Sequence, residues 1–199
     1  MSNKNLFVSL GLVVLLILVV GCAKAPQQEV DAANAALTLA KESEADRYLA
    51  DEFKAAQDSL NAALAEIETQ NSKFALGRNY NRAKALLASA TEMFNLANSK
   101  VAARKEEVKA EGQQLVLDLQ AALSEAKALL KKAPKGKEGR EVLQAIQNDL
   151  TTVETSLGEV TTLMDNGDFL GAKDKLSAGL NKVKSIIEEL NQAIAKKAR

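Results

Sequence analysis

The chain has few side chains that could carry out acid–base, nucleophilic or metal chemistry. It contains no histidine and a single cysteine, Cys22, among its 199 residues. The commonest general base and the mixed histidine and cysteine metal site are therefore absent, and no disulfide can form within the chain. Adjacent carboxylates such as Glu106 and Glu107 would point in different directions around a helix, so they do not make a catalytic pair. We expect a protein that is not an enzyme and that binds no metal or cofactor.

Cys22 stands in a setting that predicts a covalent modification. An apolar run extends from Leu6 to Val20 behind a short polar segment, which is the layout of a secretory signal peptide, and the run is short for a membrane span. The residues Val19-Val20-Gly21-Cys22 resemble the lipobox of bacterial lipoproteins, where small residues precede an obligatory cysteine. The resemblance implies a signal peptide over residues 1–21, cleavage between Gly21 and Cys22, and a diacylglyceryl group on the Cys22 sulfur. The alternatives are an ordinary buried thiol or a cysteine that follows an uncleaved anchor.

A lipidated Cys22 would hold the protein on a membrane surface without spanning the membrane. In Gram-negative lipoproteins, an aspartate directly after the cysteine favours retention at the inner membrane, and this position is Ala23 here. The resemblance therefore implies the periplasmic face of the outer membrane. Residues 22–28 include Pro26 and are expected to form a tether between the lipid and the first helix.

The rest of the chain predicts helices. Alanine carries much of its apolar content, and the whole chain of 199 residues contains only two prolines and ten glycines that could interrupt helices. Apolar residues recur three and four apart from residue 30 to 40, from 53 to 67, from 143 to 164 and from 169 to 194. Between the second and third of these segments, an apolar or aromatic residue recurs at every seventh position from Tyr80 to Leu129, which predicts one long helix. Polar or glycine-containing turns are expected at residues 43–51, 71–81, 133–139 and 165–168.

These segments predict an all-α fold, an elongated antiparallel helical bundle in which two three-helix bundles share the long central helix. Residues 29–111 would form an N-terminal alanine-rich bundle, and residues 112–199 a C-terminal bundle. The continuity of the long helix through Gly112 is left open. Its charged middle, residues 100–111, offers only Val101 and Val108 as large apolar side chains. This stretch is expected to be thinly covered, either as a solvated connector or as a site for a partner helix or self-association.

Residues 30–109 carry a further resemblance. The pattern Tyr48-x-x-Asp51-x-Phe53-x-x-Ala56-x-x-x-Leu60-x-x-Ala63, followed by Tyr80-x-x-Ala83, resembles an uncharacterised helical domain family of Gram-negative outer-membrane lipoproteins. The resemblance implies a helical packing domain that often accompanies peptidoglycan-binding or efflux-type envelope domains. It implies no catalytic activity.

A group of basic residues is a candidate binding surface. Antiparallel hairpins would bring the 133–139 loop and the C-terminal end of the chain to one membrane-distal end. The residues concerned are Lys131, Lys132, Lys135, Lys137, Arg140, Lys196, Lys197 and Arg199. They could complement helix dipoles, or they could bind an anionic envelope component such as peptidoglycan or an acidic protein. Since the net charge is zero and charges of both signs alternate, nucleic acid is not expected as a partner.

The sequence therefore predicts a membrane-anchored periplasmic lipoprotein with a non-catalytic structural or protein-interaction role in the cell envelope. The alternative is a carrier or chaperone that binds an apolar ligand or a partner helix between its helices. Unfilled volume within the alanine-lined bundle would favour this alternative, and a tightly packed core would count against it.

Overall fold

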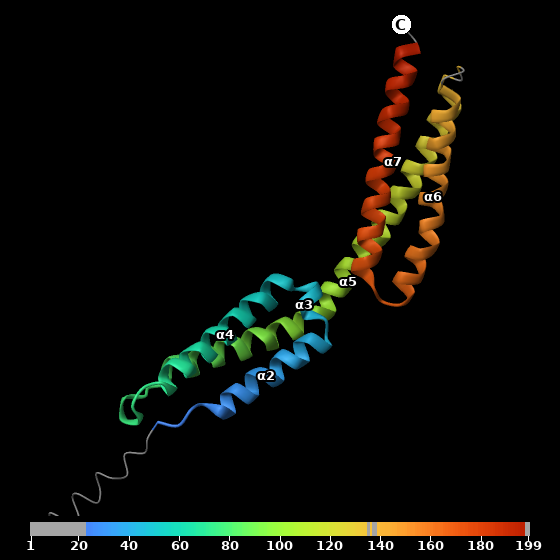
Figure 1. The fold of residues 1–199 in the computed structure, drawn as a ribbon. Helices are drawn as coiled ribbons and strands as arrows, with labels where there is room; N and C mark the ends of the chain where they lie inside the picture. Colours follow the sequence, from blue (N-terminus) through green and yellow to red (C-terminus); the bar gives the residue numbers. More distant parts are fainter. Residues whose placement is uncertain (1–22, 135, 137–138, 198–199) are drawn as a thin grey trace, which may run out of the picture. The chain divides into compact units, whose positions relative to one another are not determined.

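Most of the described part of the chain is helical, and the described residues contain no strand, as the sequence predicts. The computed structural model describes residues 23–134, 136 and 139–197 (Figure 1). Its elements are α2 (Gln27–Glu42), α3 (Ala45–Tyr48), α4 (Ala50–Asn71), the short 3-10 helix η1 (Ala75–Gly77), α5 (Asn81–Lys132), α6 (Gly139–Asp165) and α7 (Phe169–Lys197). The predicted all-α class and helical bundle are confirmed.

The long central helix is continuous. α5 extends over 52 residues and passes through Gly112 without interruption. A Cβ atom at Gly112 would lie 3.5 Å from the Met164 sulfur, an ordinary contact distance, so this glycine neither breaks the helix nor marks a forced close approach. The question that the sequence left open is thereby answered.

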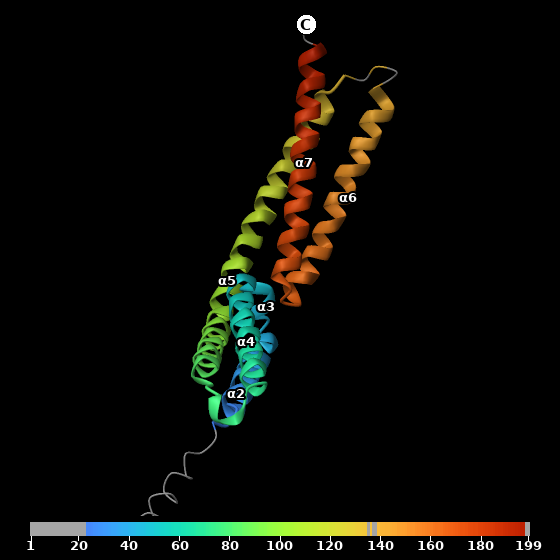
Figure 2. The same cartoon turned by 60° about the vertical axis from the view of Figure 1, so that its left-hand side comes forward.

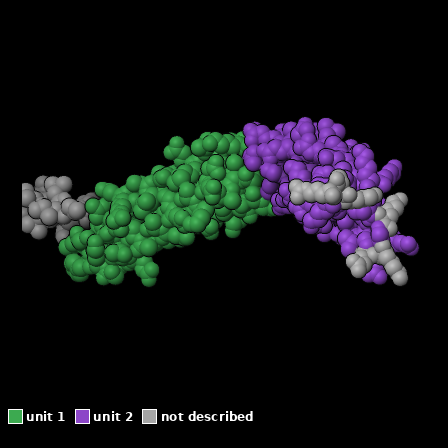
Figure 3. All heavy atoms as spheres, turned by 90° about the horizontal axis from the view of Figure 1, so that it is seen from above, with its two compact units in different colours: residues 1–101 green, residues 102–199 purple. Residues whose placement is uncertain are grey.

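The chain divides into two compact units, residues 1–101 and residues 102–199 (Figure 3). Unit 1 contains α2, α3, α4 and the first part of α5, and unit 2 contains the rest of α5 with α6 and α7. The division falls ten residues before the 111/112 boundary suggested by the sequence. The residues in between make contacts within unit 2, because Lys109 lies over the Phe169 ring and Glu111 forms an ion pair with Lys173.

Alanine allows the helices of unit 1 to pack closely. Its core is made by Ala33, Ala36, Ala40, Ala45, Phe53, Ala56, Leu60, Ala63, Leu87, Ala90, Phe94, Ala97 and Val101. The bulk within this small-residue core comes from Phe53 of α4 and Phe94 of α5, whose ring centroids lie 5.3 Å apart in an edge-to-face arrangement. Ser59 adds a hydrogen bond between the same two helices by donating to the Leu86 carbonyl at 3.0 Å.

Unit 2 has a leucine- and valine-rich core. Its central buried side chains are Leu119, Leu150, Leu176, Val183 and Leu190. The turn between α6 and α7 lies where the sequence predicts one. Gly167 adopts a φ of 79°, which glycine tolerates best, and the Asp168 carboxylate accepts a hydrogen bond from the Gly171 amide at 3.3 Å.

One expectation about the middle of α5 is wrong. The sequence predicts that Val101 and Val108 lie on a thinly covered stretch, but their exposed fractions are 3% and 0%. Val101 packs into the core of unit 1. The number of large apolar residues that a helix segment carries does not determine how well other segments cover them, and neither valine offers a free apolar surface to a partner.

Candidate functional site

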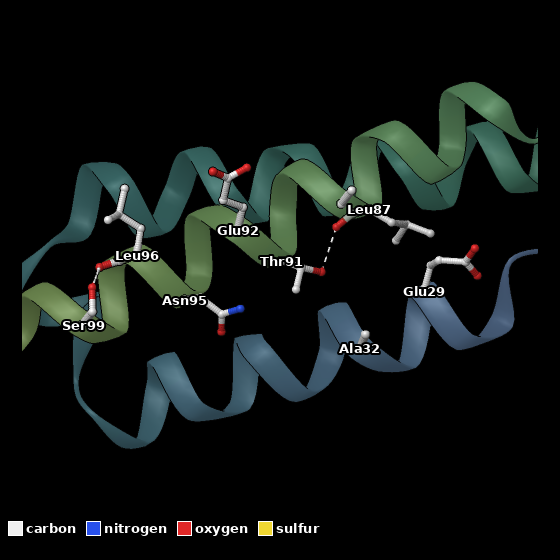
Figure 4. A pocket seen from close by; sticks show the side chains of 9 residues that line it. Glu29, Ala32, Leu87, Thr91, Glu92, Asn95, Leu96 and Ser99 are labelled. Atoms are coloured by element: carbon white, nitrogen blue, oxygen red, sulfur yellow. Dashed lines mark hydrogen bonds between the residues drawn. The ribbon is translucent and has the colours of Figure 1, made fainter.

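A large groove lies between α2 and α5 of unit 1. It has a volume of about 710 Å³ and is lined by Glu29, Ala32, Leu87, Ala88, Thr91, Glu92, Asn95, Leu96 and Ser99. Figure 4 shows these side chains coming from the two helices, with Thr91 and Asn95 on the side of α5 that faces α2. Two of its lining residues, Ala32 and Ala88, are exposed and have small side chains that leave space between the helices, and the buried Leu87 forms another part of the lining.

An ion pair lies at one end of this groove. The Glu29 carboxylate, in the first turn of α2, accepts a hydrogen bond from the Lys84 ammonium group of α5, with an oxygen–nitrogen distance of 2.8 Å. The hydrogen bond from Lys84 is the main reason that the pKa of the Glu29 carboxyl lies below its ordinary value. The pair joins the two helices and keeps Glu29 ionised, so this carboxylate is an ion-pair partner and is poorly suited to act as a proton donor.

The hydroxyl groups in the groove are bonded to their own helix. Thr91 donates to the Leu87 carbonyl at 2.8 Å, and Ser99 donates to the Leu96 carbonyl at 2.7 Å. A nucleophilic hydroxyl needs an adjacent base, whereas these two engage backbone carbonyls. The arrangement suits contact with an apolar surface.

Four of the eight residues of the predicted basic surface have described side chains. Lys131 and Lys132 are exposed in the last turn of α5, Arg140 is exposed in the first turn of α6, and Lys196 is exposed near the end of α7. Lys131 and Arg140 line one hollow of about 370 Å³ together with Leu130, Leu143, Gln144 and Gln147. In unit 2 the end of α7 lies at the same end as the α5–α6 connection (Figure 2).

Other predicted site residues lie outside the described part of the chain. These are Gly21, Cys22, Lys135, Lys137 and Arg199, together with the side chain of Lys197. The predicted signal peptide, its cleavage site and the lipidation of Cys22 therefore stay predictions. Ala23, the residue after Cys22, is described, and the chain continues from it to the start of α2 at Gln27.

Ion pairs join each pair of helices in unit 2. Lys127 of α5 pairs with Glu154 of α6, and Lys182 of α7 pairs with Asp149 of α6 at 2.7 Å. Between α5 and α7, Glu111 contacts Lys173 and also lies 3.2 Å from Arg104 of its own helix. The hydrogen bond from Lys173 is the main cause that lowers the pKa of Glu111. These ion pairs are spread along the helix surfaces and connect neighbouring helices, so we interpret them as contacts that align the bundle and not as a binding or catalytic site.

The described residues form neither a metal-binding cluster nor a membrane-spanning helix. Within residues 23–134, 136 and 139–197, no cluster of three or more acidic, histidine or cysteine side chains has the grouping needed to hold a metal ion. Among the helices of the same described ranges, none combines the length and apolar character that crossing a membrane requires.

Sequence reasoning missed two surface features. The first is the α2–α5 groove, which depends on which small residues of two distant helices come to face each other. The second is a pair of exposed apolar side chains, Phe74 and Leu76, in the connection between α4 and α5. A usable signal was present, because these are large apolar residues in the otherwise polar 71–79 stretch and neither continues a helical stripe.

Comparison with known proteins adds no relative. No protein family model matches the chain, and the searches find no curated protein and no solved structure that is significantly similar to it.

Proposed function

We propose that the protein is a lipid-anchored lipoprotein of the bacterial cell envelope, held at the periplasmic face of the outer membrane, with a non-catalytic structural or protein-interaction role. The observation that carries the proposal is the Val19-Val20-Gly21-Cys22 motif directly after a signal-length apolar run. The short segment from Ala23 to the start of α2 at Gln27 is consistent with it, since it would keep unit 1 close to an anchor on Cys22.

Lipidation is tested by substituting Cys22. The unmodified chain should incorporate labelled palmitate in a Gram-negative host and fractionate with membranes, and Cys22→Ser should lose both properties. Lys41→Gln, at an exposed position of α2, is the control and should leave both unchanged. Palmitate incorporation that persists in Cys22→Ser would refute the anchor at this residue.

The choice of membrane has its own test at the next residue. Ala23→Asp introduces the residue that retains Gram-negative lipoproteins at the inner membrane, so the variant should move from the outer-membrane to the inner-membrane fraction. Ala23→Asn has a similar size without the charge and serves as the control. If the unmodified protein already fractionates with the inner membrane, the proposed location is wrong.

The proposed partner is an anionic envelope component, such as peptidoglycan or an acidic protein, at the basic end of unit 2. The support is the hollow that Lys131 and Arg140 line together. Reversing the charges of Lys131, Lys132, Arg140 and Lys196 should abolish cosedimentation with purified cell wall if peptidoglycan is the partner. The control reverses four exposed lysines elsewhere: Lys41, Lys54, Lys100 and Lys184. Equal cell-wall binding by the two variants would contradict the peptidoglycan assignment.

A second candidate function is the carriage of a small apolar ligand, and the α2–α5 groove favours it. Its volume of about 710 Å³ lies within the range of small-molecule sites. A fluorescent naphthylamine probe should bind to the unmodified chain, and Ala32→Phe should weaken binding by filling the groove. Ala55→Phe, at an exposed position of α4, is the matched control. Unchanged binding in Ala32→Phe would exclude the groove as the ligand site.

A further inference from the structure

The connection between α4 and α5 displays two large apolar side chains to solvent. The side chain of Phe74 is 79% exposed and that of Leu76 is 75% exposed, the highest values among the large hydrophobic residues that the structure describes. They flank Ala75, at the start of η1. Single exposed apolar residues are common on protein surfaces, but two at one loop tip form a small apolar patch.

This connection is held in a defined conformation. Arg78 donates to the carbonyls of Lys73 and Asn71, at 3.0 and 2.9 Å, and thereby closes the loop that carries the two apolar residues. Tyr80 is buried and its hydroxyl donates to the Asn71 side chain at 2.6 Å. The buried Gln70 accepts a hydrogen bond from the Asn79 amide at 3.0 Å. The apolar tip is therefore presented on a fixed base.

The connection that carries the tip is basic, because residues 72–80 contain Lys73 and Arg78 and no aspartate or glutamate. Residues 69–91 contain four cationic side chains, those of Lys73, Arg78, Arg82 and Lys84, and no aspartate or glutamate. Arg82 and Lys84 pair with Glu66 and Glu29. Arg78 donates its hydrogen bonds to backbone carbonyls, which are neutral. These contacts therefore do not neutralise the positive charge of its guanidinium. An apolar tip with cations around its base matches a surface that has negative headgroups over an apolar interior.

The tip lies at the end of unit 1 where the chain enters the unit. Figures 1 and 2 both show the start of α2 beside the α4–α5 connection. Ala23 and Lys24 line a hollow of about 350 Å³ together with Arg78, Asn79, Tyr80, Asn81 and Lys84. Ala23 directly follows Cys22, the proposed lipid attachment site, so the described chain leads from this connection to the anchor.

We propose that the 72–80 connection is a membrane-contact loop, in which Phe74 and Leu76 enter the interfacial layer of an anionic lipid surface while Lys24, Lys73 and Arg78 lie at its phosphate groups. The inference rests on the proposed lipid anchor, which brings the loop to the membrane. Its consequence is that unit 1 contacts the membrane at two points, a covalent lipid and an inserted loop, and is thereby oriented on the surface.

The chain has no tryptophan, so a single introduced tryptophan reports on membrane depth. Phe74→Trp and Leu39→Trp are made in the full chain, and each purified protein is reconstituted into phosphatidylethanolamine–phosphatidylglycerol vesicles with a nitroxide lipid labelled near the headgroup. Leu39 is the control because it is also exposed, and it lies about 18 Å along α2 from the helix start. We expect the Phe74→Trp protein to show about threefold or greater quenching relative to the Leu39→Trp protein, with a blue-shifted emission.

Equal quenching of the two vesicle-bound variants would overturn the loop contact. Replacing phosphatidylglycerol by phosphatidylcholine should reduce the quenching of the Phe74→Trp protein, and undiminished quenching would overturn the role of the cations.

The lipid anchor is tested separately. The mass of the peptide that contains Cys22 shows whether the residue is lipidated, and vesicle flotation of Cys22→Ser shows whether membrane attachment depends on it. A lipidated protein that floats without preferential quenching of the tryptophan at position 74 would refute the loop and leave the anchor intact. If Cys22 carries no lipid, the proteins are mixed with an excess of vesicles and the quenching is measured again. Quenching of the tryptophan at position 74 would then support the loop contact and refute the lipid anchor. No quenching would refute both.

Discussion

At the scale of single residues, Glu111 shows how unit 2 uses its surface charges. Its carboxylate contacts Lys173 of α7 and lies 3.2 Å from Arg104 on α5, so one anion connects cations from two helices. The Glu111 side chain is 41% exposed, and solvent therefore screens much of the attraction. The expected contribution is modest, but its dependence on pH has a definite sign.

We predict that Glu111→Gln lowers the free energy of unfolding by about 0.5 kcal/mol at pH 7. The pKa of Glu111 is lowered in the folded protein, chiefly by the hydrogen bond from Lys173. The contribution is therefore present above the unfolded-state pKa, which is that of an ordinary glutamate, and is lost as the pH falls through the lower folded-state value. Urea unfolding at a series of pH values measures this: the two proteins should differ at pH 7 and converge in acid.

Glu106→Gln is the control for this experiment. Glu106 pairs at 3.7 Å with Lys109 on the same helix, so its removal breaks no connection between helices. A stability difference between the unmodified protein and Glu111→Gln that stays constant down to the lowest pH would contradict the assigned role of the carboxylate.

Gly179 marks a close approach of the three helices in unit 2. A Cβ atom there would lie 3.3 Å from both the Leu119 and Val153 side chains. We predict that Gly179→Ala lowers the free energy of unfolding by about 1 kcal/mol, because overpacking outweighs the gain in helix propensity. Thermal unfolding, monitored by circular dichroism, measures the change.

Gly158 provides the matched control, because it lies in α6 and a Cβ atom there would have nothing within 4 Å. Gly158→Ala should raise stability by about 0.5 to 1 kcal/mol through helix propensity alone. If both alanine variants stabilise the protein equally, α7 does not require a glycine at position 179.

At the scale of elements, the 72–80 connection depends on side chains from the helices that it joins. Gln70 is 6% exposed. Its side-chain oxygen accepts a hydrogen bond from the Asn79 backbone amide, and its side-chain nitrogen donates one to the Glu66 carboxylate at 2.6 Å. We predict that Gln70→Leu lowers the free energy of unfolding by about 1 to 3 kcal/mol, because the Asn79 amide loses its partner. It should also speed proteolysis within residues 72–80, which limited digestion followed by mass spectrometry detects.

Gly77→Ala tests the opposite explanation of the same connection. Gly77 has no left-handed φ, and a Cβ atom there would have nothing within 4 Å. The substitution should therefore be close to neutral in stability and protease resistance. A large loss in Gly77→Ala would show that backbone freedom, rather than the Gln70 network, holds the connection.

The helices and their core faces could be predicted because their apolar stripes are regular. Along α6, Ile146, Leu150, Val153 and Val160 follow the predicted stripe and are buried. On α7 the stripe predicts Ile187, four residues after Val183, but the structure buries Ile186 to 3% exposure while Ile187 is only partly buried. Two neighbouring isoleucines are equivalent to a periodicity argument, and packing against the other helices decides between them.

The candidate site features also differ in how far they can be predicted from the sequence. The Cys22 motif is local in sequence and can be recognised without a structure, although no described residue tests it. The α2–α5 groove requires Ala32 and Ala88, distant in sequence, to line one groove. The exposed Phe74 becomes significant only because the connection that carries it lies beside Ala23 and Lys24, which line one hollow with Arg78 and Tyr80. A single sequence contains no information on such pairings beyond the periodicity of each helix.

At the scale of the whole molecule, the two cores predict two cooperative unfolding units. The buried clusters of units 1 and 2 have no residue in common, and the alanine-rich core of unit 1 contains fewer large side chains than that of unit 2. Since apolar burial dominates stability, unit 1 should be the less stable of the two. α5 continues through both, and its backbone hydrogen bonds connect neighbouring turns but do not replace a lost core.

We predict that Phe94→Ala destabilises unit 1 selectively. Phe94 is fully buried against Phe53, so its truncation should cost about 3 to 5 kcal/mol. Amide hydrogen exchange read by mass spectrometry should show lost protection in α2, α4 and the first part of α5, with α6 and α7 unchanged. Leu176→Ala, which truncates a fully buried side chain of unit 2, should give the reverse pattern. Loss of protection throughout the chain in both variants would mean that the continuous helix makes the two cores one cooperative unit. Selective loss would instead mean that each core unfolds as a unit of its own, although α5 continues through both.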